Sequence, residues 1–298
     1  MNVCGRELHV KGRLVKIGHL EGDKYESLAN PDAAIAEIRA GRARVDLFTF
    51  LEKLPITSPQ YTYPMVWDNL AVLPVTTYND WWTKQINNKT RNMVRRSEKS
   101  GVTTSEVVFD DELVRGITTI YNEVPNRQGK PFPHYGKDFE TVKRISATFP
   151  EQSTFIGAYL NGELIGFAKI VADRDGGQAS LMHIVSLYQH RDKAPTNALI
   201  AQAVRSCADR NIPYLVYSNF AYGKKQRDTL SDFKEYNGFE RVDLPRYYVP
   251  VSAAGRIALQ LQLHRGLADL VPESVQTTIR TMRTRWYHWR TQLKQRPA

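Results

Sequence analysis

The chain has 298 residues, 42% hydrophobic and 24% charged, which is typical of a folded globular protein and excludes a disordered one. Cys4 and Cys207 form neither a zinc-binding spacing nor a disulfide framework. No run of about 20 apolar residues predicts a transmembrane helix, and the N-terminus has no apolar run of signal-peptide length. We expect a cytoplasmic protein, either free or peripheral to the inner face of the membrane.

Residues 1–79 form the first predicted region, a small α/β unit. HVKGRLVKI is typical of one strand, and VDLFTFL and NLAVLPV predict two more. Between the first two, Asn30 suits a helix cap, Pro31 the first helical position and Asp32 the positive helix end.

Residues 80–251 form the second region. It opens with one basic helix that is capped by Asn79 or Asp80, continues through KTRNMVRRSEKS and ends at Gly101. Hydrophobic periodicity then predicts the order strand, two helices, three strands, helix, strand, helix and two strands, the last two being GFERVDL and RYYVPV.

Two turns and one cap fix the boundaries within this order. Asp110 is the predicted cap of the first of these helices. The pair Asn161-Gly162 between apolar runs predicts a hairpin, and Asp175-Gly176-Gly177 predicts the next turn.

Residues 252–298 form a basic helical extension, the third region. From Pro245 onward nine Lys or Arg face only Asp269 and Glu273, so most of the net charge of +10 lies there. A helix from about Glu273 carries one apolar stripe, made by Val275, Ile279, Met282, Trp286, Trp289 and Leu293. The stripe is compatible with packing against the rest of the protein, with a dimer interface or with binding to an anionic membrane. The positive charge is also compatible with binding to tRNA. The oligomeric state stays open.

The second region resembles the GNAT superfamily in its element order, and FKEYNGFERV is similar to the helix–Gly-Phe–strand signature of that superfamily. KTRNMVRRSEKSGV resembles the start of the second domain of Fem-type peptidyltransferases, which add amino acids to peptidoglycan precursors, and of polysaccharide-associated acyltransferases. The resemblance implies an α/β fold with a GNAT-type mixed central sheet flanked by helices. It also implies acyl transfer to an amine, on an amino sugar or a cell-envelope precursor.

The donor turn departs from the GNAT pattern. Acyl-CoA-dependent GNAT enzymes carry a glycine-rich turn before their long helix, whereas YQHRDKAPTNAL has no glycine. The residues left to bind the donor are Arg191, Lys193, Thr196 and Asn197, with Asn219 and Tyr222 after the next strand. Acyl-CoA is the co-substrate that the resemblance implies, but Fem-type enzymes lack this turn and use aminoacyl-tRNA. Lys234 stands where GNAT enzymes often have a tyrosine acid, so that role is not carried over.

The polar segment 121–139 is the predicted acceptor side, since such a loop is seldom a plain connection. Glu123, at the helix end, is a candidate general base. Candidate acceptor ligands follow it: Arg127, Gln128, Lys130, His134 and Tyr135. The alternative is an ordered surface loop.

His183 is the second candidate base, because a histidine is neutral near pH 7 and the family's fourth strand borders the reaction site. Strict alternation would place Leu181, His183 and Val185 on one face and Met182 on the other. A hydrogen-bonded core histidine is the alternative.

These features together predict an N-acyltransferase that uses acyl-CoA or a similar thioester. An aminoacyl-tRNA-dependent peptidyltransferase and a non-catalytic GNAT-fold binding module are the two alternatives. No HExxH, GxSxG, Walker or zinc motif occurs, so no metal or bound cofactor is predicted.

Overall fold

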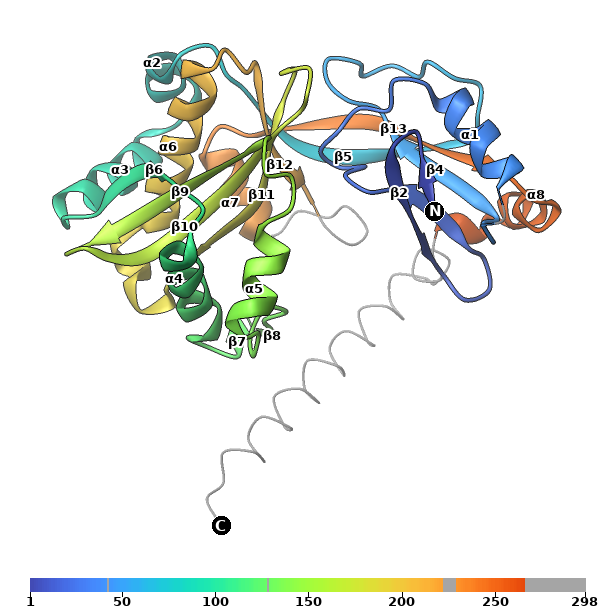
Figure 1. Ribbon diagram of the computed structural model, residues 1–298. Coiled ribbons are helices and arrows are strands. Elements are labelled where there is room, and N and C mark those ends of the chain that lie inside the picture. Colours follow the sequence, from blue (N-terminus) through green and yellow to red (C-terminus); the bar gives the residue numbers. More distant parts are fainter. Residues whose placement is uncertain (42, 128, 222–228, 266–298) are drawn as a thin grey trace.

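The computed structural model describes residues 1–41, 43–127, 129–221 and 229–265 (Figure 1). The predicted C-terminal helix from Glu273 lies outside these residues. The strands are β1 (Asn2–Val3), β2 (Arg6–Lys11), β3 (Ile17–Leu20), β4 (Leu47–Leu51), β5 (Met65–Pro74), β6 (Thr103–Val107), β7 (Asn126–Arg127), β8 (Lys130–Pro131), β9 (Ser153–Leu160), β10 (Glu163–Ala172), β11 (Ala179–Ser186), β12 (Tyr214–Asn219) and β13 (Glu240–Pro250).

The helices are α1 (Pro31–Ala40), α2 (Tyr78–Asp80), the π-helix η1 (Trp81–Gln85), α3 (Asn88–Lys99), α4 (Asp111–Asn122), α5 (Phe139–Ser146), the 3-10 helix η2 (Tyr188–Lys193), α6 (Pro195–Asp209), α7 (Thr229–Tyr236), α8 (Ala253–Gln260) and the 3-10 helix η3 (Leu263–Arg265). None of the helices in the described part of the chain has both the length and the apolar character needed to cross a membrane.

A mixed sheet of 11 strands runs through the molecule in the order β1-β2-β3-β4-β13-β5-β12-β11-β10-β9-β6. Figure 1 shows two lobes, one around β1–β4 and one around β6 and β9–β12, with the long strands β5 and β13 running between them. β13 pairs with β5 from Glu240 to Tyr247 and with β4 from Arg246 to Pro250. The sheet is therefore continuous across the boundary between the first two predicted regions.

Helices flank the sheet of the second lobe: α4 and α5 lie on one face, and α6, with α3 outside it, covers the other (Figure 1). The apolar side of α6, including Leu199, Ile200 and Val204, is buried in the largest core cluster together with Ile156 and Phe167 of β9 and β10. This is the GNAT-type mixed sheet flanked by helices that the element order predicted.

Several local predictions are confirmed. The side chain of Asn30 accepts a hydrogen bond from the Ala33 N–H, and Asp110 caps α4 through the Leu113 N–H. The hairpin turn between β9 and β10 has left-handed φ angles of 52° at Asn161 and 84° at Gly162.

Two strand predictions were wrong. HVKGRLVKI is not one strand: β2 and β3 form a hairpin, since Gly12 has a φ of 99° and a Cβ there would lie 2.0 Å from the Val15 carbonyl oxygen. GFERVDL and RYYVPV, in contrast, form the single strand β13. Pro245 is tolerated inside it because its backbone faces the side on which β4 has just ended, where its carbonyl still accepts from the Glu52 N–H.

The predicted basic helix is also divided. Thr77 caps α2, which continues into the π-helix η1, and Asn87 caps α3 after a break at Ile86. The Arg91 guanidinium donates to the carbonyl oxygens of Trp82 and Ile86, so the break leaves these acceptors satisfied.

Candidate active site

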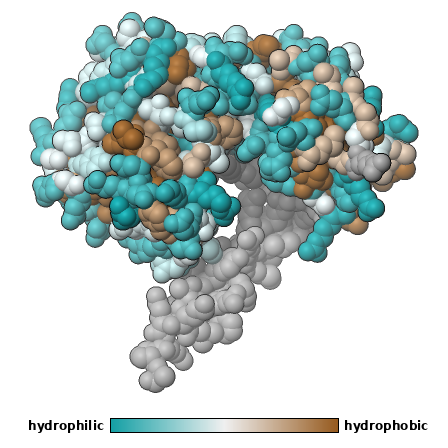
Figure 2. Space-filling model, viewed as in Figure 1, coloured by the Kyte–Doolittle hydropathy of each residue, from teal (hydrophilic) through white to brown (hydrophobic). Residues whose placement is uncertain are grey.

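A cleft with a volume of about 690 Å³ lies between the two lobes. One wall comes from β2, β3 and the loop that contains Tyr25, and the other from the α5–β9 connection, β11 and β12. Asp68 and Arg246 from β5 and β13 lie where the lobes meet. Figure 2 shows the surface indented between the lobes on the face in view. A substrate in this cleft would contact both lobes, as ligand sites between lobes commonly do.

A β-bulge in β11 brings two consecutive side chains into the cleft. Lys169 of β10 pairs with His183, but Ile170 pairs with Leu181, so Met182 is the extra residue. Met182 and His183 both line the cleft. The prediction that they occupy opposite faces was therefore wrong, because a bulge interrupts the two-residue alternation and re-aims the side chains around it.

His183 meets a second histidine from the predicted acceptor loop. Its ring lies edge-on to His134, with 5.6 Å between centroids, and His134 stacks on Tyr121 at 4.4 Å. The Lys137 ammonium lies 3.0 Å from Nδ1 of His134. Burial, followed by the charges of nearby basic groups, lowers the pKa of His183 to about 4; burial and Lys137 do the same for His134. Both rings are therefore neutral at pH 7.

β11 and β12 diverge beside His183. The two parallel strands pair only through Ala179 with Leu215 and Ser180 with Val216. Past that point Ser218 has a left-handed φ of 50°. Asn219 lines both the cleft and a second cavity of about 80 Å³, which β11 and β12 line together with β4, β5, β13 and the loop that contains Tyr25. Asn219 is thus at the predicted donor side, whereas Tyr222 lies outside the described residues.

The other predicted donor residues surround the start of α6 but do not line the cleft. Arg191 stacks on Tyr188 at 4.3 Å, and Lys193 pairs with Asp192 at 3.5 Å. The Thr196 hydroxyl lies 3.1 Å from that of Ser186.

Asn197 is buried, and its amide donates to Asn237 before β13. Ala194 starts α6 with a left-handed φ of 52°, a conformation that glycine adopts at less cost. Arg191 and Lys193 remain accessible at this turn, whereas Asn197 serves packing.

Glu123 and Arg127 tie the acceptor loop to the donor turn. The Glu123 carboxylate accepts from the Tyr188 and Gln189 N–H groups at 2.6 and 2.9 Å and pairs with Arg127 at 3.3 Å. Arg127 also donates to the Ser186 carbonyl at 2.7 Å. The Glu123 carboxylate and the Arg127 guanidinium are therefore already bound to other groups of the protein.

Two of the three remaining acceptor candidates, Lys130 and Tyr135, lie at the surface. Lys130 is exposed, Tyr135 is 48% exposed, and Gln128 lies outside the described residues.

A buried ionic cluster beneath the cleft was missed by the sequence analysis. Arg246 reaches Asp23 at 2.9 Å and Asp68 at 2.7 Å, and Lys53 donates to the Asp23 carbonyl at 2.5 Å. Burial lowers the pKa of Lys53 to about 8. Burial would raise the pKa of Asp23, but Arg246 and Lys53 outweigh it and the pKa is lowered. The available signal was Arg246 within the run LPRYYVPV, whose other residues are apolar or aromatic.

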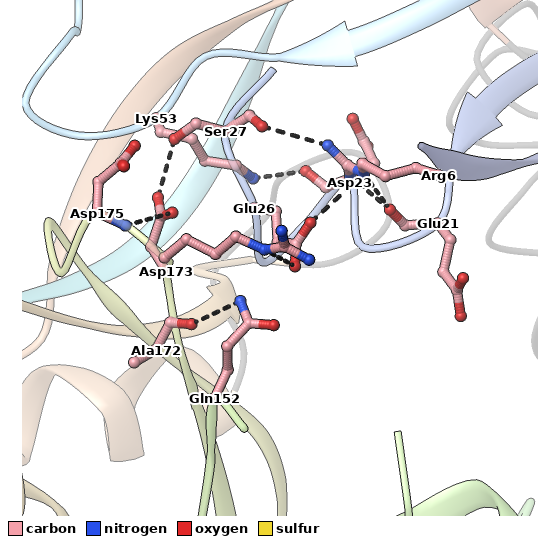
Figure 3. Close-up of polar contacts among 11 residues, drawn as sticks. Arg6, Glu21, Asp23, Glu26, Ser27, Lys53, Gln152, Ala172, Asp173 and Asp175 are labelled. Carbon is pink, nitrogen blue, oxygen red and sulfur yellow. Dashed lines mark hydrogen bonds and ion pairs between the residues drawn. The ribbon is translucent and has the colours of Figure 1, made fainter. Parts of the chain in front are cut away.

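Further polar contacts fasten the loop between β3 and α1, which carries Asp23, to the second lobe (Figure 3). Ser27 donates to Asp173, beyond the end of β10, at 2.9 Å. Glu26 pairs with Arg6 of β2 at 3.5 Å and with Arg174 at 3.4 Å. One wall of the cleft is therefore held by polar contacts to both lobes.

The fold is similar to several solved structures, although no protein-family model and no curated protein matches the sequence. FemX aligns over 86% of each chain with 10% identity and a TM-score of 0.59. The C-terminal domain of a putative lysylphosphatidylglycerol synthetase from Agrobacterium fabrum covers 86% of this chain and 84% of its own, with 10% identity and a TM-score of 0.56.

L-PGS from Bacillus licheniformis covers 86% of this chain and 85% of its own, with 14% identity and a TM-score of 0.53. Identities this low show the fold alone. Topology and likeness together establish that the chain has a GNAT-like fold of the Fem type.

Proposed function

We propose that this protein is an acyltransferase that moves an acyl group from acyl-CoA or a similar thioester to an amine bound in the cleft. The observation that carries the proposal is the divergence of β11 and β12 directly beside His183. The gap offers a slot for the extended arm of a donor, and the cleft offers room for an acceptor. The FemX-like fold supports this reaction class.

The chemistry requires an amine nitrogen to attack the acyl carbonyl, so that a C–N bond forms and the C–S bond breaks. The nitrogen loses a proton and the departing thiolate gains one. A neutral His183 can accept a hydrogen bond, or transiently the proton, from the attacking amine. His134, packed against His183 and Tyr121, would hold the ring in place. Holding both reactants in one cleft supplies the proximity that acyl transfer needs.

Donor binding is tested by calorimetric titration with acetyl-CoA and with a longer acyl-CoA. We expect saturable binding that weakens in Arg191→Ala, at the start of α6, and is kept in Arg241→Ala, an exposed site on β13. Absence of binding at millimolar ligand would reject a CoA donor.

Aminoacyl-tRNA is the second candidate donor, favoured by the exposed cationic residues of α3 (Lys89, Arg95, Arg96 and Lys99). Phosphate contacts of this kind make binding fall steeply with salt. Binding of charged tRNA that weakens with salt and in Arg96→Gln/Lys99→Gln, but not in Lys143→Gln on α5, would select this donor. An affinity for charged tRNA that does not change with salt concentration would exclude aminoacyl-tRNA as the donor.

The proposed acceptor is an amine on an amino sugar or a cell-envelope precursor. Mass spectrometry of reactions with the bound donor would identify an acylated amine. His183→Ala should lower its rate of formation while donor binding persists. If no acceptor is acylated and His183→Ala leaves every measured property intact, a non-catalytic binding module is the correct interpretation.

A further inference from the structure

The β2–β3 hairpin carries four side chains of types that can bind a metal ion, and three of them line the cleft. His9 lies directly opposite His19 in the antiparallel register, with 5.8 Å between ring centroids. Two residues away on each strand, Glu7 and Glu21 are joined by a backbone hydrogen bond from the Glu21 N–H to the Glu7 carbonyl at 2.7 Å. Residues separated by two positions share one face of a strand, so the hairpin presents a two-by-two array of imidazoles and carboxylates.

The array is electrostatically unfavourable as it stands. Like charges directly opposite each other on paired strands destabilise the sheet. Within the described part of the chain, the Glu7 carboxylate has one ion-pair contact, with His9 at 3.9 Å. Arg6 binds the backbone carbonyl of Glu21 and not its carboxylate, and Figure 3 shows the Glu21 side chain pointing away from the ionic cluster. A bound cation would relieve this repulsion.

We propose that Glu7, His9 and Glu21 form a binding site for a divalent transition-metal ion of the Zn²⁺ type, with His19 as a neighbouring fourth ligand. One ligand atom from each of the first three residues already lies within 4.8 Å of the other two. Zinc holds nitrogen and oxygen ligands at about 2.0–2.2 Å, which sets adjacent ligands roughly 3.4 Å apart in a tetrahedron. Glu7 and Glu21 are exposed, so rotation of their side chains can close the difference.

The donor set selects the class of ion. Imidazole nitrogen with carboxylate oxygen suits zinc and its neighbours, whereas magnesium and calcium prefer oxygen alone. His19 adds a second imidazole nitrogen directly opposite His9 in the strand register. Lys11, two residues after His9 on β2, and Arg246, which lines the same cleft, are nearby cations that would oppose binding.

The position of the array suggests its use. His9, His19 and Glu21 all line the cleft, so an ion held by them would face it. When only Glu7, His9 and Glu21 bind it, such an ion keeps its fourth tetrahedral position for an anionic oxygen of a bound molecule, in place of His19. That last step rests on the proposed function, with the oxygen belonging to the acceptor, but binding of the ion itself does not.

The test is calorimetric titration of Zn²⁺ into the full-length, chelator-treated protein, without donor or acceptor. We expect one ion per chain, and binding about 100-fold weaker or absent in His9→Ala/Glu21→Gln, since even outer-shell changes cost roughly 10- to 100-fold in metal affinity. Cys4→Ser is the matched control, because Cys4 is an exposed thiol beside Glu37 that could bind zinc elsewhere on this lobe.

A second variant keeps the test independent of any folding defect. Glu7→Lys should remove zinc binding yet raise the melting temperature of the metal-free protein, because it replaces the repulsion with an ion pair. Circular dichroism checks the fold of each variant. Absence of saturable binding at about 100 micromolar Zn²⁺, or binding unchanged in the double variant, would overturn the proposal. Loss of binding in Cys4→Ser alone would also overturn it.

Discussion

Lys169 of β10 lies directly opposite His183 of β11; Lys169 is fully buried, and His183 is partly buried where it lines the cleft. The Lys169 ammonium donates to the Ser146 carbonyl at 2.8 Å and to the Thr148 hydroxyl at 3.0 Å, and so satisfies acceptors at the C-terminal end of α5. Burial lowers the pKa of Lys169 to about 8. The positive charge of Lys169 adds to the effect of burial, and both lower the pKa of the His183 imidazole. A residue of the neighbouring strand thus helps to keep the candidate base neutral.

Stability should fall as the pH drops from about 6.5 to 4. The folded pKa of His183 is about 4 and the unfolded value about 6.5, so the unfolded chain binds more protons in this window. The contribution of His183 to the free energy of unfolding is complete above pH 6.5 and is lost towards pH 4. It amounts to at most roughly 3 kcal/mol. Urea denaturation across this range should show a shallower dependence for His183→Gln than for the wild type. An identical slope in both would contradict the assignment.

Lys169→Met should destabilise the protein by about 1–3 kcal/mol, because it leaves buried carbonyl oxygens without a donor. It should also raise the pKa of His183, since one opposing positive charge is gone. NMR titration of the imidazole measures the second effect separately from the first. An unmoved His183 pKa would show that burial and the remaining neighbours alone determine it.

Arg246→Met should destabilise the protein by about 3–5 kcal/mol, because it leaves the buried Asp23 and the partly buried Asp68 without their counter-charge. Arg241→Met is the matched control on the same strand: Arg241 and its partner Asp243 are each 42% exposed, so the expected cost is about 0–1 kcal/mol. Chemical denaturation of both variants provides the comparison. Equal costs would mean that the buried cluster contributes no more than a surface pair.

Glu123→Gln separates a structural role from a catalytic one. The carboxylate accepts from two backbone N–H groups of η2, so the amide should cost about 1–3 kcal/mol and speed hydrogen exchange at Tyr188 and Gln189. Glu140→Gln, on the exposed side of α5, should change neither quantity. Unchanged exchange combined with a displaced pH–rate profile would restore Glu123 as the general base.

The sequence by itself determined most of the element order, because hydrophobic period, caps and turn residues act locally. Asn30 and Asp110 cap their helices, and Asn161-Gly162 turns the hairpin, through contacts with residues a few positions away. It also directed attention to His183 and His134, which the fold brings together. The wrong predictions came from local rules that contacts with distant strands override. The bulge at Met182 depends on how β10 pairs with β11. The strand β13 stays continuous through Pro245 because β4 ends there.

Only the tertiary structure decided where the cleft lies and what surrounds it. Arg246, Asp23 and Asp68 are separated by up to 223 positions in the chain, and no local pattern relates them. The array of Glu7, His9 and Glu21 likewise exists only after the hairpin has set its register. Local propensity acts over a few residues, whereas the sites of this protein arise from strand pairing and charge burial, which join residues that the sequence keeps far apart.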